Sequence, residues 1–194
     1  MGALGSIYNA VDNPHKAIEY HNKRFIIAQK IQHRSGEMEA LNNLGLVYEN
    51  QKEYTKALEN YQLALSIAQE IQDISSKGKL LLNIGIVYSY LEDYILSIEH
   101  IKKSLKIMHE LPYIRGEGNA WRYLGNTYYF QGDNHQAIDC YKKSLHIRQK
   151  LNDREGQEKI LIYLGMAYCA LGNYAQAIKY NQQHLHILRC STNK

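Results

Sequence analysis

Apolar residues recur along this chain at helical spacing, and the same arrangement returns every forty residues. In the second copy, four residues stand at positions i, i+3, i+4 and i+7 of one helix face, namely Leu41, Leu44, Gly45 and Tyr48. Equivalent sets are Leu81, Ile84, Gly85 and Tyr88, then Trp121, Leu124, Gly125 and Tyr128, then Leu161, Leu164, Gly165 and Tyr168, and a shorter copy is Leu4-Gly5-Ser6-Ile7-Tyr8. A period between about 20 and 50 residues indicates stacked supersecondary units instead of one globular core.

A short polar turn follows each of these patterns, and a second apolar pattern follows each turn. The turns are Asp12-Asn13-Pro14, Lys52-Glu53, Glu92-Asp93, Gly132-Asp133 and Gly172-Asn173. Each second pattern opens with a small residue, at Ala17, Ala57, Ser97, Ala137 and Ala177. Polar or helix-breaking residues mark the unit boundaries near 32–36, 72–78, 112–116 and 152–156. Each unit is therefore predicted to be a hairpin of two helices, of about 15 to 18 residues each.

The glycine that recurs inside the first helix of each unit predicts a close helix contact. Glycine within a helix costs about 1 kcal/mol relative to alanine. Five copies at one register therefore indicate that the second helix crosses there, and we expect its small opening residue to admit the glycine. Trp121 stands where other units have Leu, so we expect it in the core.

The order of these residues resembles the tetratricopeptide repeat. The nearest copy is Trp121-x-x-Leu124-Gly125-x-x-Tyr128, followed by Ala137 and Tyr141. The family's usual unit is about 34 residues, so the chain resembles the longer variety found in kinesin light chains and spindle-orientation adaptors. Arg24 and His184 depart from the pattern where a small residue is expected.

The resemblance implies an all-α fold, a right-handed solenoid of antiparallel helical hairpins. We expect a single domain over residues 1–194, with repeats at 1–34 (partial), 35–74, 75–114, 115–154 and 155–194. Only four residues precede Gly5, the first of the recurring glycines, and no extra capping helix follows the last unit. A fragment of a longer repeat protein is therefore expected, with exposed apolar ends that favour self-association.

Composition narrows the class of protein. Two prolines in 194 residues leave no candidate linker, and no apolar run approaches the roughly 20 residues that span a bilayer. No leader pattern opens the chain, and three cysteines without a Cys-x-x-Cys pair favour a reducing compartment, so we expect a cytoplasmic protein without membrane association. The net charge of +4 falls short of the balance typical of a dedicated nucleic-acid binder.

One arc of the first helices changes its chemistry from copy to copy, as a recognition surface on a fixed scaffold does. The resemblance implies that this arc holds an extended or helical peptide of a partner protein. Amides could bond the peptide backbone, and Arg122 and Lys79 could pair with its carboxylates, so we expect a partner with apolar and acidic residues. The candidate residues are Asn42, Asn43, Leu46, Lys79, Leu82, Asn83, Ile86, Tyr90, Arg122, Tyr123, Asn126, Tyr129, Phe130, Ile162, Tyr163 and Met166.

Other functions are less favoured by the residues. A structural or oligomerising segment is the main alternative, and a patch formed by Lys102, Lys103, Lys106, Lys142, Lys143 and His146 could contact anions or nucleic acid. The clamp for C-terminal carboxylates in one subfamily is matched by Arg122 and Asn126, but Tyr163 stands where it needs Asn. Neither a metal-ligand pair nor a phosphate-loop, hydrolase-elbow or zincin motif occurs, so no cofactor, metal or enzymatic activity is expected. Cys169 falls in the arc and is interpreted as a small apolar filler.

Overall fold

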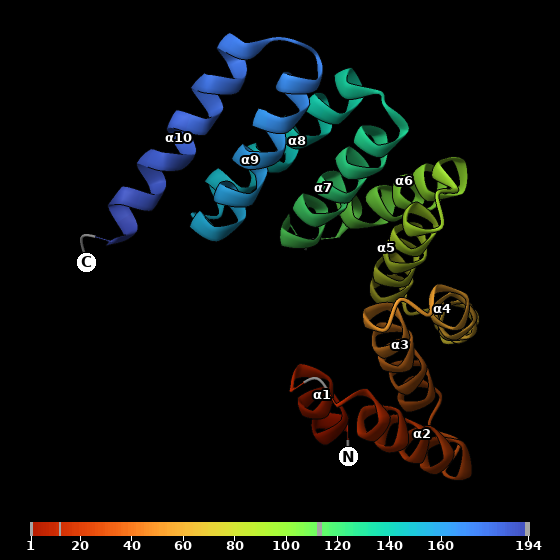
Figure 1. The fold of residues 1–194 in the computed structure, drawn as a ribbon. Coiled ribbons are helices and arrows are strands. Elements are labelled where there is room, and N and C mark those ends of the chain that lie inside the picture. The colour runs from red at the N-terminus through yellow and green to blue at the C-terminus, as the bar shows by residue number, and fades with distance from the viewer. Residues whose placement is uncertain (1, 12, 112–113, 193–194) are drawn as a thin grey trace. The chain divides into compact units, whose positions relative to one another are not determined.

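The computed structural model describes residues 2–11, 13–111 and 114–192, except for the side chains at 2, 3 and 190–192. The described residues form helices without strands, so the predicted all-α fold is confirmed (Figure 1). The helices are α1 (Gly2–Ala10), α2 (Pro14–Lys30), α3 (Arg34–Asn50), α4 (Tyr54–Glu70), α5 (Ile74–Tyr90), α6 (Tyr94–Glu110), α7 (Ile114–Gln131), α8 (Asn134–Lys150), α9 (Arg154–Ala170) and α10 (Tyr174–Thr192).

Helix starts repeat with the period of the sequence. The first helices α3, α5, α7 and α9 begin forty residues apart, and so do the second helices α2, α4, α6, α8 and α10. From α2 to α9 every helix has 17 or 18 residues, within the predicted range. The hairpin unit predicted from the apolar pattern is therefore confirmed.

The chain divides into two compact units, Met1–Ile107 and Met108–Lys194, which we call unit 1 and unit 2. In unit 1, α2 packs against α1 and α3, and α4 packs against α3 and α5. In unit 2, α8 packs against α7 and α9, and α10 packs against α9. Each unit has its own core, and helices that are neighbours in sequence build it. This arrangement is that of a helical solenoid.

The side chain that lies closest to the recurring glycine is not that of the small residue that opens the second helix. A Cβ atom on Gly45 would lie 2.5 Å from the ring of Tyr61, and one on Gly125 would lie 2.6 Å from the ring of Tyr141. Both rings are buried, and each follows the small opening residue of its helix by four positions. The close helix contact is thus confirmed. A Cβ atom on Gly85 would lie 3.1 Å from the backbone oxygen of Ser97, so in that unit the predicted small residue also lies against the glycine. The small residues let the helices cross, and the ring fills the space above the glycine.

The predicted unit boundaries are too wide. Only three residues separate α4 from α5, so Gly78 lies inside the first turns of α5 and is buried. Its carbonyl oxygen accepts a hydrogen bond of 2.7 Å from the Ser104 hydroxyl of α6. Gly36 and Gly116 are likewise buried inside α3 and α7. These glycines allow close helix packing. In the sequence alone, a glycine of this kind cannot be distinguished from one that marks a turn.

Trp121 also differs from its expected place. It is half-buried instead of lying in the core, and its indole Nε1 donates to Glu117 Oε1 at 3.3 Å. The Lys143 ammonium lies 4.1 Å from the centre of the indole ring. A polar N–H and a large ring explain the half-buried position, because the ring can pack while its edge keeps a polar partner.

One backbone arrangement ends seven of the described helices, namely α2, α3, α4, α5, α7, α8 and α9. After α2, the N–H of His33 donates to the carbonyl of Ala28, and the N–H of Gln32 donates to that of Gln29. This is the Schellman motif, which requires a left-handed residue just after the helix. Gln32 has φ of 54°, and the equivalent residues with positive φ are Lys52, Gln72, Glu92, Gly132, Asn152 and Gly172.

Candidate functional site

The candidate residues lie on the arc of α3, α5, α7 and α9 that we call the first-helix face. In unit 1, Asn83 Nδ2 of α5 donates to Asn42 Oδ1 of α3 at 3.2 Å, so the two amides join neighbouring repeats. Leu46 and Tyr90 are exposed, and the Tyr90 ring stacks on Tyr54 with centroids 5.2 Å apart. Asn43 is half-buried and Lys79 is exposed on the same arc.

Two residues predicted on this face are buried. Leu82 is 7% exposed and Ile86 is 6% exposed, so neither offers its side chain to a ligand, and the expectation for these two is wrong. The segment Leu80–Val87 of α5 is apolar at almost every position. A helix that is apolar around much of its circumference buries more than one stripe, because each apolar side is removed from water.

In unit 2 the first-helix face keeps large apolar side chains in contact with solvent. Phe130 of α7 is 56% exposed, and Ile162 and Met166 of α9 are 39% and 45% exposed. Tyr129 contacts Phe130 edge to face, with ring centroids 6.0 Å apart. Ile162 and Met166 are four residues apart and so lie on the same side of α9. This part of the face therefore offers apolar area from two neighbouring helices.

The buried Tyr141 of α8 contacts two residues of that face, Asn126 and Tyr163. Its hydroxyl donates to Asn126 Oδ1 at 2.9 Å, and its ring stacks on Tyr163 with centroids 5.5 Å apart. Burial raises the pKa of Tyr141, and Tyr163 raises it further. The phenol consequently stays protonated and keeps its bond to Asn126. Asn126 and Tyr163 thus belong to the support of the face as well as to its lining.

Arg122 is the candidate cation of unit 2. Its guanidinium carbon lies 3.9 Å from the centre of the Tyr123 ring, which fixes its orientation. Across the residues that the structure describes, Arg122 forms no ion pair. Its positive charge is therefore available to a ligand.

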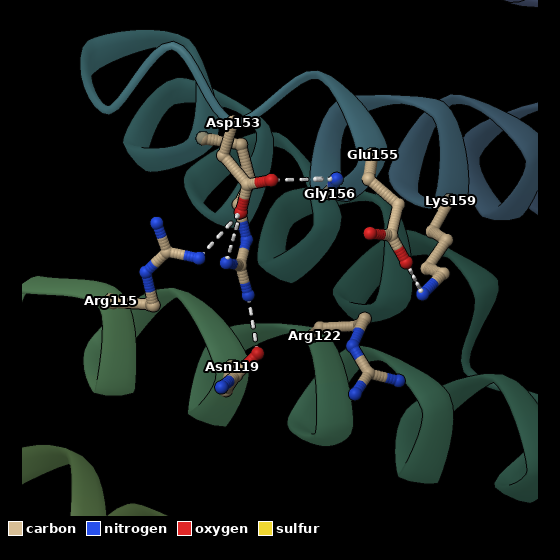
Figure 2. Close-up of a pocket in the computed structure, with 8 residues that line it drawn as sticks. Arg115, Asn119, Arg122, Asp153, Glu155, Gly156 and Lys159 are labelled. Atoms are coloured by element: carbon tan, nitrogen blue, oxygen red, sulfur yellow. Dashed lines mark hydrogen bonds and ion pairs between the residues drawn. The ribbon is translucent and has the colours of Figure 1, made fainter.

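A hollow of about 210 Å³ lies between the N-terminal halves of α7 and α9, beside Arg122 (Figure 2). Three of its residues come from α7, and Figure 2 shows them opposite those of α9. Of the lining residues, only Arg122 was predicted from the sequence to contact a partner. The full lining is Arg115, Asn119, Arg122, Arg148, Asp153, Glu155, Gly156 and Lys159.

The tetratricopeptide repeat profile matches residues 1–70, 36–110 and 116–189 of the chain. The chain belongs to the tetratricopeptide-repeat family. Tetratricopeptide repeat proteins are generally non-catalytic scaffolds for protein interaction. No curated protein matches the sequence.

Several solved structures have a similar fold. BtubC (BKLC) from P. vanneervenii has a TM-score of 0.88 at 21% identity, over 98% of this chain and 78% of BtubC. Rap protein complexed with Competence and Sporulation Factor has a TM-score of 0.82 at 17% identity, over 94% of this chain and 51% of Rap. The STAND protein of Pyrococcus horikoshii with a tetratricopeptide repeat sensor has a TM-score of 0.84 at 20% identity, over 97% of this chain and 29% of that protein. These likenesses show the shared fold.

The basic residues of the second helices have internal contacts in this tetratricopeptide repeat chain. Lys103 pairs with Glu99 at 2.6 Å, and Lys142 lies 5.7 Å from the centre of the Tyr168 ring. Lys102, Lys103 and Lys106 belong to unit 1, whereas Lys142, Lys143 and His146 belong to unit 2. A shared patch across these six residues therefore stays a prediction.

Three further predictions concern metal binding, the cysteines and membrane association. Within the described residues, no three His, Cys, Asp or Glu side chains gather as a metal site would require. Cys140 is buried and Cys169 is exposed. The expectation that Cys169 is a small apolar filler is therefore wrong. In the same portion of the chain, no helix combines the length and the apolar character needed to cross a lipid bilayer. The cytoplasmic location stays a prediction.

Proposed function

We propose that the first-helix face of unit 2 binds an extended or helical segment of a partner protein. The observation that carries the proposal is the set of exposed apolar side chains Phe130, Ile162 and Met166 on α7 and α9. The cation Arg122 of α7 forms no ion pair among the described residues. Single exposed apolar residues are common on proteins, but apolar residues grouped on one face mark interaction surfaces. The apolar side chains of a partner segment would bury Phe130, Ile162 and Met166, and an acidic side chain would pair with Arg122.

The supporting contacts favour a preformed surface. Asn126 and Tyr163 are held by Tyr141, and Arg122 is held by Tyr123. Side chains that are already ordered lose little conformational freedom when a ligand binds, so more of the contact energy appears as affinity. The complex of Rap with Competence and Sporulation Factor supports the proposal at the level of the fold.

The test uses side chains that are exposed and have no role in the support. The variant F130S/I162S/M166S is expected to lose the partner in a pull-down, because the apolar contact area is removed. The control variant I26S/L63S/I95S removes three exposed apolar side chains from the second helices α2, α4 and α6. Both variants should keep the helical circular-dichroism signal. Binding that survives in the first variant, or is lost in both, contradicts the proposal.

A structural role in end-to-end packing is the second candidate. Ile178 and Leu185 of α10 are exposed, whereas the equivalent Ile138 and Leu145 of α8 are buried against α9. The exposed face of α10 thus has the composition that a following hairpin covers elsewhere in the chain. Sedimentation velocity over a hundredfold range of concentration tests this role. Growth of the sedimentation coefficient that the variant I178S/L185S abolishes supports it, and a constant monomer contradicts it.

A further inference from the structure

The hollow between α7 and α9 contains a charged side chain at a core position. Arg148 of α8 is only 5% exposed. The residues forty, eighty and one hundred and twenty positions earlier are Met108, Ala68 and Ala28, and all three are buried apolar residues. Burying a charge costs free energy unless it is paired, and a buried ion pair rarely stabilises a fold more than apolar packing does. The fold itself therefore gives no reason for arginine here.

The contacts of Arg148 hold it as part of a network. Its Nη1 donates to Asp153 Oδ2 at 2.7 Å, and its Nη2 donates to Asn119 Oδ1. The buried Nε has no hydrogen-bond partner among the described residues. Gly156 leaves room for the side chain, because a Cβ atom there would lie 2.6 Å from Arg148 Cδ. The network thus orders the guanidinium and Asn119 at the wall of the hollow.

The negative charge of Asp153 is compensated by arginine side chains within this network. Burial alone would raise its pKa, but the Gly156 N–H, at 3.0 Å, and the Arg148 guanidinium hold the pKa below its ordinary value. Arg115 Nη1 lies 3.7 Å from the same carboxylate. Asp153 is therefore ionised near neutral pH, and two arginines share its single negative charge. Positive charge remains in excess at this end of the hollow.

The other end of the hollow is also cationic. Lys159 pairs with Glu155 at 2.6 Å, and both side chains are mostly exposed, so the pair is weak. Figure 2 shows Arg122 on α7 opposite Glu155 and Lys159 on α9. Four cationic side chains face two carboxylates around the hollow, which leaves an excess of two positive charges.

This excess is absent from the equivalent positions of α3, α4 and α5 in unit 1. The positions equivalent to the lining, eighty residues earlier in α3, α4 and α5, contain two carboxylates and one lysine. They are Ser35, Glu39, Asn42, Ala68, Asp73, Ser75, Ser76 and Lys79. The repeat scaffold does not require the cationic lining, since the same positions in unit 1 carry an excess of negative charge.

We propose that the hollow is a subsite for an anionic group, a carboxylate or a phosphate monoester, carried by the partner segment. The hollow as an anion site rests on its own geometry, whereas the source of the anion rests on the proposed function. Guanidinium groups bind the oxygens of both anions through paired hydrogen bonds. A volume of about 210 Å³ accommodates either group together with the start of its side chain. The Arg122 guanidinium and the Lys159 ammonium are the groups that meet the anion.

The test uses small probes and the whole chain. N-acetyl phosphoserine amide, N-acetyl glutamate amide and neutral N-acetyl glutamine amide are titrated while the backbone amide and arginine Nε–H signals are followed by NMR. Phosphoserine, glutamate or both should shift the signals of residues 115–122 and 154–159 saturably, and glutamine should not. The variant R122Q/K159Q should weaken this binding at least tenfold. The control K103Q removes an exposed, ion-paired lysine of unit 1 and should leave it unchanged.

The outcomes separate the two sources and the two proposals. A response to phosphoserine alone identifies a phosphate subsite, and a response to glutamate alone identifies a carboxylate subsite. No saturable response to either anion, or an equal response in R122Q/K159Q, overturns the subsite. The pull-down with F130S/I162S/M166S tests the first-helix face independently. If the probes bind but the partner still binds the variant F130S/I162S/M166S, the subsite is supported and the proposed function is contradicted.

Discussion

At the scale of single residues, the recurring glycines have unequal roles that the sequence does not distinguish. Gly125 faces the buried ring of Tyr141, whereas Gly165 faces the side-chain oxygen of Asn181, which is exposed. A buried ring cannot move away from an added methyl group without disturbing the core, but an exposed amide can rotate. Both glycines stand in the same Leu-Gly-x-x-Tyr pattern, which gives no sign of the residue that each one faces across the hairpin.

This difference predicts opposite effects of two matched substitutions in unit 2. Gly125→Ala should lower the free energy of unfolding by about 2 kcal/mol, because overpacking of the Tyr141 ring outweighs the helix propensity of alanine. Gly165→Ala should leave it unchanged or raise it by up to about 1 kcal/mol. Urea unfolding measures both effects. Equal losses in the two variants would show that the side chain across the hairpin is not the cause.

His21 is predicted to make stability depend on pH. Its ring is buried against Gly5, and its Nδ1 has no partner among the described residues. Burial lowers the pKa of His21 and nearby Arg24 lowers it further, so the folded state favours the neutral ring. The unfolded chain then binds the proton more readily. The free energy of unfolding should therefore be constant above the ordinary histidine pKa of about 6.5 and fall as the pH drops below it.

The variant H21F isolates this contribution, because phenylalanine fills the same space without titrating. Chemical unfolding at pH 7.5 and pH 5.5 should show a smaller loss of stability in H21F than in the natural chain. A loss of the same size in both proteins would assign the pH dependence to other groups.

Residue-level prediction from the sequence failed where burial depends on neighbours. Leu82 and Ile86 share the register of exposed residues such as Ile162 and Met166, yet they are buried. Arg148 was missed because it stands in the polar end of a helix, which suggests solvent exposure. Comparison with Ala68 and Met108 at the same register would have identified it as a charge in a core position.

At the scale of helices, the sequence predicted the elements well because each apolar stripe is repeated forty residues later. The hairpins and their lengths followed directly from that repetition. The boundary glycines did not, since Gly78 is needed for the approach of Ser104 and not for a turn. The true ends of the helices are set by a left-handed residue, which is glycine in only some of the units.

The non-glycine residues at these ends are expected to weaken the fold. Glu92 has φ of 62°, a conformation that costs a residue with a side chain about 1 kcal/mol relative to glycine. Glu92→Gly should therefore raise the midpoint of thermal unfolding by a few degrees. Asn152→Gly should raise it less, because asparagine tolerates this conformation. Gly132→Ala is the reverse control and should lower the midpoint; a midpoint that Glu92→Gly leaves unchanged would contradict the account.

At the scale of the whole molecule, the chain is a tetratricopeptide repeat protein whose two compact units each contain a core of neighbouring helices. The single domain over residues 1–194 stays a prediction. Within unit 1, the scaffold brings the faces of the first helices α3 and α5 into contact, as the hydrogen bond between Asn42 and Asn83 illustrates. Side chains that vary on such faces therefore form a surface without affecting the hairpins, which is how a repeated fold acquires a particular ligand.

The central claim is that the partner lies on the first-helix face of unit 2. A photoreactive benzoylphenylalanine in place of Met166 of α9 tests it most directly, with the same group in place of the exposed His146 of α8 as the control. Both proteins are irradiated in an extract of the source cell. The account predicts one partner crosslinked from position 166 and competed by unlabelled natural chain, with none from position 146. Crosslinking from position 146, or none from position 166 while the partner still binds, would contradict it.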